Sequence, residues 1–182
     1  MAIAHLTTSS SFLFLLLTAT IRAATEPNAD DGYSQLLSPA KLRLRKEKLS
    51  HLHFYYHDIL SRPSPTAVPI VRPTTNSSTF FGLVNMFDDL LTVGLEPSSK
   101  IVGRAQGFYG FASHSEFAAL TAQNFVFVEG RNAVLSPVKE LPVIGGTGAF
   151  RFARGYAEAR TRVSDLTNGD AVVEYNIYVY HY

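Results

Sequence analysis

One aspartate stands among apolar side chains in a segment that has the alternation of a β-strand. The segment 52–60 reads Leu-His-Phe-Tyr-Tyr-His-Asp-Ile-Leu, and because strand side chains alternate between two faces, Asp58 shares a face with Phe54 and Tyr56. If that face points inward, burial raises the pKa of Asp58, and its carboxyl can donate a proton or anchor a ligand near neutral pH. The local pattern equally allows Asp58 to mark a turn at the end of the strand.

Arg154 is a second candidate for a buried charge. In the run 150–156 it shares a strand face with Phe150, Phe152 and Tyr156. An unpaired arginine inside a protein is costly, so we expect Arg154 to pair with an acid, and Asp58 is one candidate partner.

The strand predicted at 101–112 carries further polar groups on both faces. Arg104, Gln106 and Phe108 share one face, and Tyr109 lies on the other. Spacing alone does not decide which of the two faces points inward.

The sequence gives little support for a metal site, a phosphate-binding loop or thiol chemistry. His51, His53 and His57 share a strand face and could bind a metal, but the expected glutamate does not follow them and no second histidine motif appears later. We therefore predict a solvated outer face and no metal. The run 145–148, Gly-Gly-Thr-Gly, lacks the lysine and the following helix of a phosphate loop and is interpreted as a tight turn. The sequence contains no cysteine, which excludes disulfides and thiol catalysis, and no cofactor is predicted.

The elements that must position these residues are strands throughout. After the run at 51–60, and a Pro- and Ser-rich loop or edge strand at 61–79, the predicted strands are 80–87, 101–112, 118–128, 133–144, 150–163 and 171–182. Turn-forming residues separate them at 95–99, 129–132, 145–148 and 168–170. Strands at hairpin spacing without intervening helices indicate an antiparallel sandwich or barrel, and a barrel is favoured because closure removes exposed hydrophobic edges.

Composition and termini define the organisation of the chain. The 182 residues are 46% hydrophobic and 17% charged with a net charge of +1, which suits one globular domain at 51–182 and gives no reason to expect nucleic acid or membrane partners.

Residues 1–24 are predicted to be a signal peptide, so the protein should be secreted. Residues 25–50 are a polar and basic leader, whose basic run at 42–49 is interpreted as solvated rather than as a polyanion or membrane site. Asn76 begins the one glycosylation sequon.

Several segments together resemble the dirigent family of plants. The matching segments are 54–59, 87–92, 102–107 (Val-Gly-Arg-Ala-Gln-Gly), 145–148, 154–157 and 170–176. The resemblance covers residues 50–182. It implies an eight-stranded antiparallel β-barrel, secretion to the apoplast, and a homodimer or homotrimer.

The resemblance also implies alternative functions. Family members steer phenoxy radicals, produced by an external laccase or peroxidase, into one lignan stereoisomer without oxidising the phenol themselves. A legume branch instead dehydrates isoflavanols to pterocarpans through a quinone methide. The preferred hypothesis is the non-catalytic guide, the second is the dehydratase, and the third is a defence-related barrel that binds phenolics without turnover.

The family's site residues can be placed on this sequence. The cavity acid, tyrosine and arginine fall on Asp58, Tyr109 and Arg154. The aromatic side chains expected to contact the substrate are Tyr56, Phe108, Phe111 and Phe152. This chain departs from the lignan-forming pattern, since Ala149 replaces a second acid and Phe111 a second tyrosine, and the segment 127–132 looks shortened.

Overall fold

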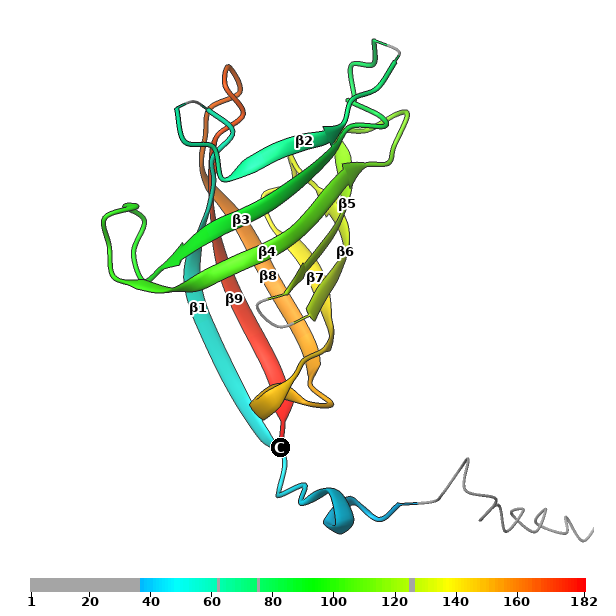
Figure 1. The fold of residues 1–182 in the computed structure, drawn as a ribbon, viewed down its shortest axis with the longest axis vertical. Helices are drawn as coiled ribbons and strands as arrows, with labels where there is room; N and C mark the ends of the chain where they lie inside the picture. The colour runs from blue at the N-terminus through cyan, green and yellow to red at the C-terminus, as the bar shows by residue number, and fades with distance from the viewer. Residues whose placement is uncertain (1–36, 62, 75, 125–126) are drawn as a thin grey trace, which may run out of the picture. The chain divides into compact units, whose positions relative to one another are not determined.

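Antiparallel strands connected by turns and longer loops form one continuous sheet (Figure 1). This computed structural model describes residues 37–182 except 62, 75, 125 and 126. The strands are β1 (Lys48–Asp58), β2 (Ala67–Val71), β3 (Val84–Thr92), β4 (Ile101–Phe111), β5 (Ala118–Asn124), β6 (Phe127–Ala133), β7 (Lys139–Gly145), β8 (Arg154–Ser164) and β9 (Ala171–His181). Two short 3-10 helices, η1 (Pro39–Leu42) and η2 (Gly148–Phe150), complete the elements.

The sheet closes on itself into the predicted eight-stranded barrel. Its strand order is β1-β9-β8-β7-β6-β5-β4-β3-β2, and β1 also pairs with β3. Strands β1 and β3 to β9 therefore form the barrel, and the short β2 adds to it at the edge of β3, where an edge strand or loop was expected. Closure leaves few unpaired strand edges, which agrees with the preference for a barrel over a sandwich.

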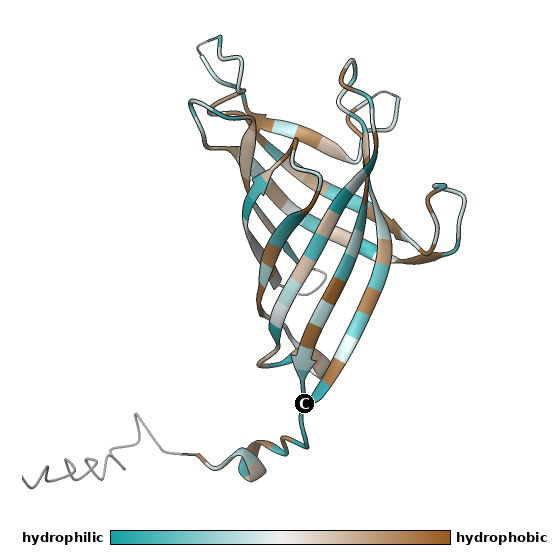
Figure 2. Cartoon of the chain, turned by 180° about the vertical axis from the view of Figure 1, so that it is seen from behind, coloured by the Kyte–Doolittle hydropathy of each residue, from teal (hydrophilic) through white to brown (hydrophobic). Residues whose placement is uncertain are grey.

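Alternation along the strands sorts side chains between the barrel interior and solvent. Figure 2 shows this as hydrophobic and hydrophilic bands that alternate along the strands. In β9, Tyr175, Ile177 and Val179 share one face and are at most 4% exposed. The interior joins them to Phe54 and Phe87 in one apolar cluster.

Several predicted strand boundaries were wrong, including the start of the strand expected at 133–144, which is Lys139, and of that expected at 150–163, which is Arg154. The strand expected at 80–87 begins at Val84 and continues to Thr92, since Phe80 and Gly82 adopt positive φ values of 57° and 89° in a turn. The turn expected at 129–132 lies within β6, where Leu120↔Arg131 and Thr121↔Gly130 are paired positions. Turn-forming residue types were overruled there by pairing with β5.

The compact unit Pro39–Tyr182 contains every element described above. The expected signal peptide at 1–24 and much of the expected leader lie outside the described residues. No helix among the residues that the structure describes is long and apolar enough to cross a bilayer. Asn76, the glycosylation candidate, is exposed between β2 and β3.

Candidate functional site

Strand β1 places Asp58 on the inner face of the barrel. Phe54 and Tyr56, on the same face, are each 6% exposed, and the Oδ1 atom of Asp58 is buried. The end of the strand is held in place by Asp170, whose carboxylate accepts hydrogen bonds from the backbone N–H of Leu60 at 2.8 Å and of Ser61 at 2.9 Å. Asp58 therefore remains in the strand, and the alternative that it marks a turn is wrong.

A second acid, Asp89, faces Asp58 from β3. Strands β1 and β3 pair through Tyr56↔Leu91 and His57↔Leu90, so the next positions along the two strands are Asp58 and Asp89. Side chains directly opposite each other in a sheet have Cβ atoms about 5 Å apart. Asp89 is 0% exposed, so the two carboxyls meet inside the barrel.

Burial and mutual repulsion keep these carboxyls protonated to an unusually high pH. Burial, followed by the charge of Asp89, raises the pKa of Asp58 to about 8, and a hydrogen bond with Tyr109 partly opposes this shift. Burial also raises the pKa of Asp89 to about 6, against hydrogen bonds from Thr66 and Tyr56 that favour its ionised form. Near neutral pH the pair therefore holds one proton, mainly on Asp58.

Tyr109 projects into the interior from β4 and connects the acids to a third strand. Its partners across the sheet are Asn85 on β3 and Thr121 on β5. Burial, and then the charge of Asp58, raises the pKa of Tyr109 far above its ordinary value, so its hydroxyl stays protonated and donates to Asp58. A hydrogen bond from Asn85 opposes this shift.

Several interior oxygen atoms have no hydrogen bond within the described part of the chain. They are Asp58 Oδ1, Asn85 Oδ1 and Thr121 Oγ1. Buried polar atoms without partners are uncommon and costly, and here one residue each of β1, β3 and β5 places such an atom near Tyr109. This group of oxygens is able to receive hydroxyl groups of a bound ligand.

Aromatic rings surround the polar group. Tyr56 lies edge-on to both Phe87 and Tyr175 with ring centroids 5.7 Å and 5.9 Å apart, and Phe87 stacks on Tyr109 at 5.9 Å. Gln123 on β5 donates a hydrogen bond of 3.0 Å to the Tyr175 hydroxyl. The interior thus combines aromatic walls with oxygen acceptors, a combination that suits a phenolic ring.

Small residues make room for these rings. A Cβ atom at Gly107 of β4 would overlap the Ala122 carbonyl oxygen and would lie 2.9 Å from Cζ of Phe87. The inner face of β8 is formed by Ala157 and Ala159, both at most 2% exposed.

The structure does not bring Arg154 to the interior, so its predicted burial was wrong; it pairs with an acid as expected, but with Glu47 and not with the candidate Asp58. Arg154 lies on the outer face of β8, where its side chain is 60% exposed and pairs with Glu47. The prediction counted faces from Phe150, but that residue belongs to η2, and β8 begins only at Arg154. Alternation from the true start turns Arg154 outward and Ala157 inward.

Of the four aromatic side chains expected to contact the substrate, two are buried and two are exposed. Tyr56 and Phe111 are buried, and Phe111 lies edge-on to Tyr109 at 6.0 Å. Phe108 and Phe152 are 43% and 54% exposed, so neither lines the interior. Phe108 occupies the outer face of β4, and Phe152 has a positive φ of 61° in the turn before β8.

Asp89, Asn85 and Gln123 were missed by sequence reasoning. The signal was present, since Asn85, Phe87 and Asp89 alternate with exposed residues as Asp58 does, but the strand was predicted to end at residue 87. Ala149, where a second acid seemed to be lost, lies exposed in η2. The interior nevertheless has a second acid, supplied by β3.

The three histidines of β1 do not converge on a common point. His51, His53 and His57 each bind a different residue through Nε2, at 2.9, 2.8 and 2.8 Å: Asn176, Glu174 and Thr92. Across the described ranges no group of three or more histidine, aspartate or glutamate side chains is arranged to hold a metal ion.

Comparison with known proteins adds independent findings. A family profile described as Dirigent-like protein matches residues 49–180. The chain is 50% identical over 183 residues to Dirigent protein 21 of Arabidopsis thaliana, across 93% of this chain and 94% of that protein. It is 44% identical over 164 residues to Pterocarpan synthase 1 of Glycyrrhiza echinata, across 82% of this chain and 87% of that protein.

A solved structure agrees with these sequence matches. The structure of a pterocarpan synthase dirigent protein matches with a TM-score of 0.72 and 43% identity, over 82% of this chain and 99% of that chain. The fold and the sequence are therefore both similar to dirigent proteins and pterocarpan synthases.

Proposed function

The chain belongs to the dirigent-like protein family, and on this premise we propose that its barrel interior binds a phenolic alcohol and removes water from it by way of a quinone methide. The observation that carries the proposal is the opposed pair Asp58 and Asp89. Near neutral pH this pair offers a protonated and an ionised carboxyl in one apolar interior. Two carboxyls with separated pKa values can divide the roles of general acid and general base.

The proton balance of the reaction closes within the pair. Asp58 protonates the leaving hydroxyl, the C–O bond breaks and water departs, while Asp89 takes the proton of the phenol, which becomes the carbonyl of the quinone methide. A second hydroxyl of the substrate then attacks the methide carbon and gives its proton to Asp58, and Asp89 returns its proton to the carbonyl oxygen. Both acids end in their starting states, and no oxidant is consumed.

Tyr109 holds and orients the reacting oxygens. Its hydroxyl stays protonated, so it can donate to Asp58 or to the oxygen of a bound quinone methide. The ring of Phe87 stacks on Tyr109 and offers an apolar surface to the substrate ring. The relatives named pterocarpan synthases support this reaction class, because the dehydration expected from the family resemblance needs an acid and a base without a redox cofactor.

Guidance of radical coupling is the second candidate. It is favoured by the aromatic interior formed by Tyr56, Phe87 and Tyr109 and by the 50% identity with Dirigent protein 21. In that case an external laccase or peroxidase supplies phenoxy radicals. The walls then fix which faces combine, because orientation decides the product of a reaction whose intrinsic barrier is small.

Two assays separate the candidates. A racemic isoflavanol without oxidant should lose water and cyclise, whereas coniferyl alcohol with an external oxidase should give racemic products. The reverse result, optically active coupling product and no oxidant-free ring closure, would replace the dehydratase by the guide. Binding of phenols without either product would contradict both and support the defence-related barrel.

Substitution of the two acids tests their roles. Asp58→Asn and Asp89→Asn should each lower kcat about 10²-fold or more, because each removes one proton-transfer step. Asp88→Asn is the matched control, since Asp88 is the neighbouring residue on the outer face, half-exposed and paired with Arg104. Equal activity of the Asp89 and Asp88 variants would remove Asp89 from the mechanism.

Secretion and self-association form part of the same proposal. The predicted signal peptide supports export to the apoplast, and the exposed Asn76 is available for glycosylation during export. An exposed apolar row crosses β2, β3 and β4 on the outer face, where Val68 pairs with Met86 and Met86 with Phe108. Such a row supports contact with a second copy, which analytical ultracentrifugation of the secreted protein would detect as a dimer or trimer.

A further inference from the structure

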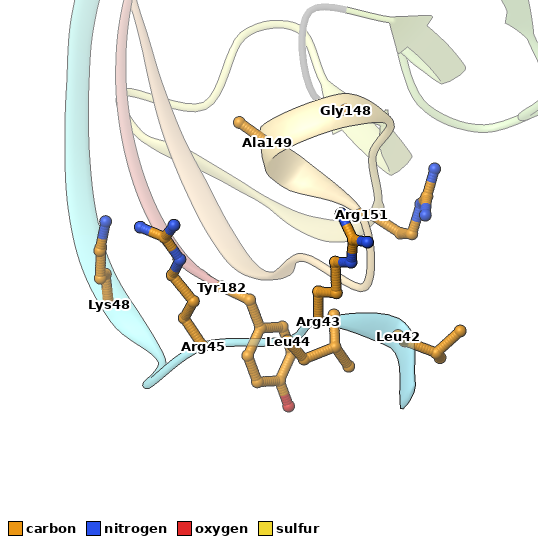
Figure 3. A pocket seen from close by; sticks show the side chains of 9 residues that line it. All are labelled: Leu42, Arg43, Leu44, Arg45, Lys48, Gly148, Ala149, Arg151 and Tyr182. Carbon is orange, nitrogen blue, oxygen red and sulfur yellow. The ribbon is translucent and has the colours of Figure 1, made fainter. Parts of the chain in front are cut away.

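A basic pocket lies outside the barrel interior, between η1 and η2. It has a volume of about 300 Å³, and four of its nine lining residues are cationic while none has an acidic side chain. The cations are Arg43, Arg45, Lys48 and Arg151. Figure 3 shows Lys48 and Arg45 toward one side of the pocket, Arg151 toward the other and Arg43 between them.

This part of the leader forms a hydrogen-bonded turn, and the side chains of its cations are exposed, as the interpretation of the basic run as solvated expected. The backbone N–H of Arg43 donates to the carbonyl of Ala40 at 3.0 Å, and that of Leu44 to Pro39 at 3.2 Å. Arg43 itself adopts a positive φ of 56°, which turns the chain after η1. Glu47 then pairs with Arg154 of β8 and so connects the residue before β1 to β8, which lies on the far side of β9 in the sheet.

The four cations share no acid within the described residues. The ion pairs found there involve none of them, since Glu47, the acid that precedes Lys48, pairs with Arg154 instead. Like charges gathered around one hollow repel each other and create a positive potential, which a bound anion would relieve.

The spread of the cations and the apolar lining of the pocket favour one kind of anion over others. Its cations are spread along the hollow rather than aimed at one point, which fits an anion with repeated charges better than a single phosphate. Leu42, Leu44 and the ring of Tyr182 line the same hollow and offer apolar contact to a ring-shaped ligand. The guanidinium group of arginine can donate two parallel hydrogen bonds to one carboxylate.

We propose that this pocket binds an acidic polysaccharide through the carboxylates of consecutive uronate sugars. The sugar rings pack against Tyr182 and the leucines, and Arg43, Arg45 and Lys48 neutralise successive carboxylates. An anionic membrane fits less well, because the cations line a concave pocket rather than a projecting surface. The site is separate from Asp58 and Asp89, so the two proposals stand or fall independently.

Calorimetric titration of the full secreted chain with a defined oligogalacturonate tests the proposal. The variant R43Q/R45Q should bind at least about tenfold more weakly, because two charge-assisted contacts are lost. The matched control R72Q/K100Q removes the same charge from exposed residues that do not line the pocket, and it should bind as the unchanged protein does. Near-ultraviolet circular dichroism of both variants verifies that the barrel is folded.

Ligand controls separate specific recognition from general charge attraction. The methyl-esterified oligosaccharide, which keeps the sugar rings and loses the charges, should not bind at about 0.15 M ionic strength. Equal weakening by both double variants would overturn the proposal in favour of net charge. Equal or tighter binding of polyphosphate, or of vesicles containing anionic lipid, would overturn the assignment to uronate.

Discussion

At the scale of residues, the arrangement depends on two aspartates that one sheet register places opposite each other. A carboxylate pair in an apolar interior cannot hold two negative charges at neutral pH, so one proton stays with the pair. Asp58 holds this proton most strongly, because burial and the charge of Asp89 raise its pKa to about 8. Asp89, with hydroxyl donors from Tyr56 and Thr66, is the member that ionises first.

This division predicts a bell-shaped pH dependence of kcat/KM for oxidant-free dehydration. Activity should rise as Asp89 loses its proton near pH 6 and fall as Asp58 loses its proton near pH 8. The measurement is initial rate against pH, with stability of the protein verified at each pH. A rate that stays constant between about pH 5 and about pH 9 would show that neither acid transfers a proton in the limiting step.

At the scale of elements, strand alternation determined which parts of the site could be predicted. Alternation in β1 allowed Asp58 to face inward but equally allowed a turn, and it was the family resemblance that indicated the inward position seen in the structure. Arg154 was misplaced because η2 and a turn with positive φ at Phe152 break the alternation before β8. Asp89 was missed because the strand was predicted to end at residue 87, although the alternation of Asn85, Phe87 and Asp89 continues past it; pairing with β1 and β4 holds β3 extended there.

The close approach of β4 to its neighbours gives a prediction about Gly107. Gly107→Ala should lower the free energy of unfolding by about 2 kcal/mol or more, since the added Cβ meets the Ala122 carbonyl and the Phe87 ring. Gly103→Ala is the matched control on the same strand, because its Cβ would lie 3.8 Å from Leu91 in ordinary contact. Chemical denaturation measures both, and equal stability of the two variants would contradict the packing described for β4.

At the scale of the whole molecule, the antiparallel all-β architecture followed from the local pattern, whereas the preference for a barrel over a sandwich rested on a general argument about exposed edges. Hairpin spacing and alternating hydrophobicity allow both a sandwich and a barrel. The contact that decides between them, β1 with β3, depends on how far the whole sheet twists and staggers before its ends meet. The family resemblance, not the local pattern, fixed the number of strands at eight.

The buried acids should make the stability of the whole barrel depend on pH. The folded pKa of Asp58 lies far above its ordinary value, so the folded state keeps a proton that the unfolded state releases, and stability falls as pH rises from about 4 toward about 8. Asp58→Asn removes this loss and should be more stable than the unchanged protein by at least about 2 kcal/mol at about pH 8. Chemical denaturation at several pH values measures the difference, and parallel pH curves for the two proteins would contradict it.

The most direct test of the site is the titration of the Asp58 carboxyl itself. Carbon-detected NMR of the full chain with labelled aspartate, assigned by comparison with Asp58→Asn and Asp89→Asn, follows each carboxyl through its own transition. The structure predicts a midpoint near pH 8 for Asp58 and near pH 6 for Asp89, and a downward shift of Asp58 when Asp89→Asn removes the facing charge. A midpoint for Asp58 near pH 4, unaffected by the change at Asp89, would contradict the paired site.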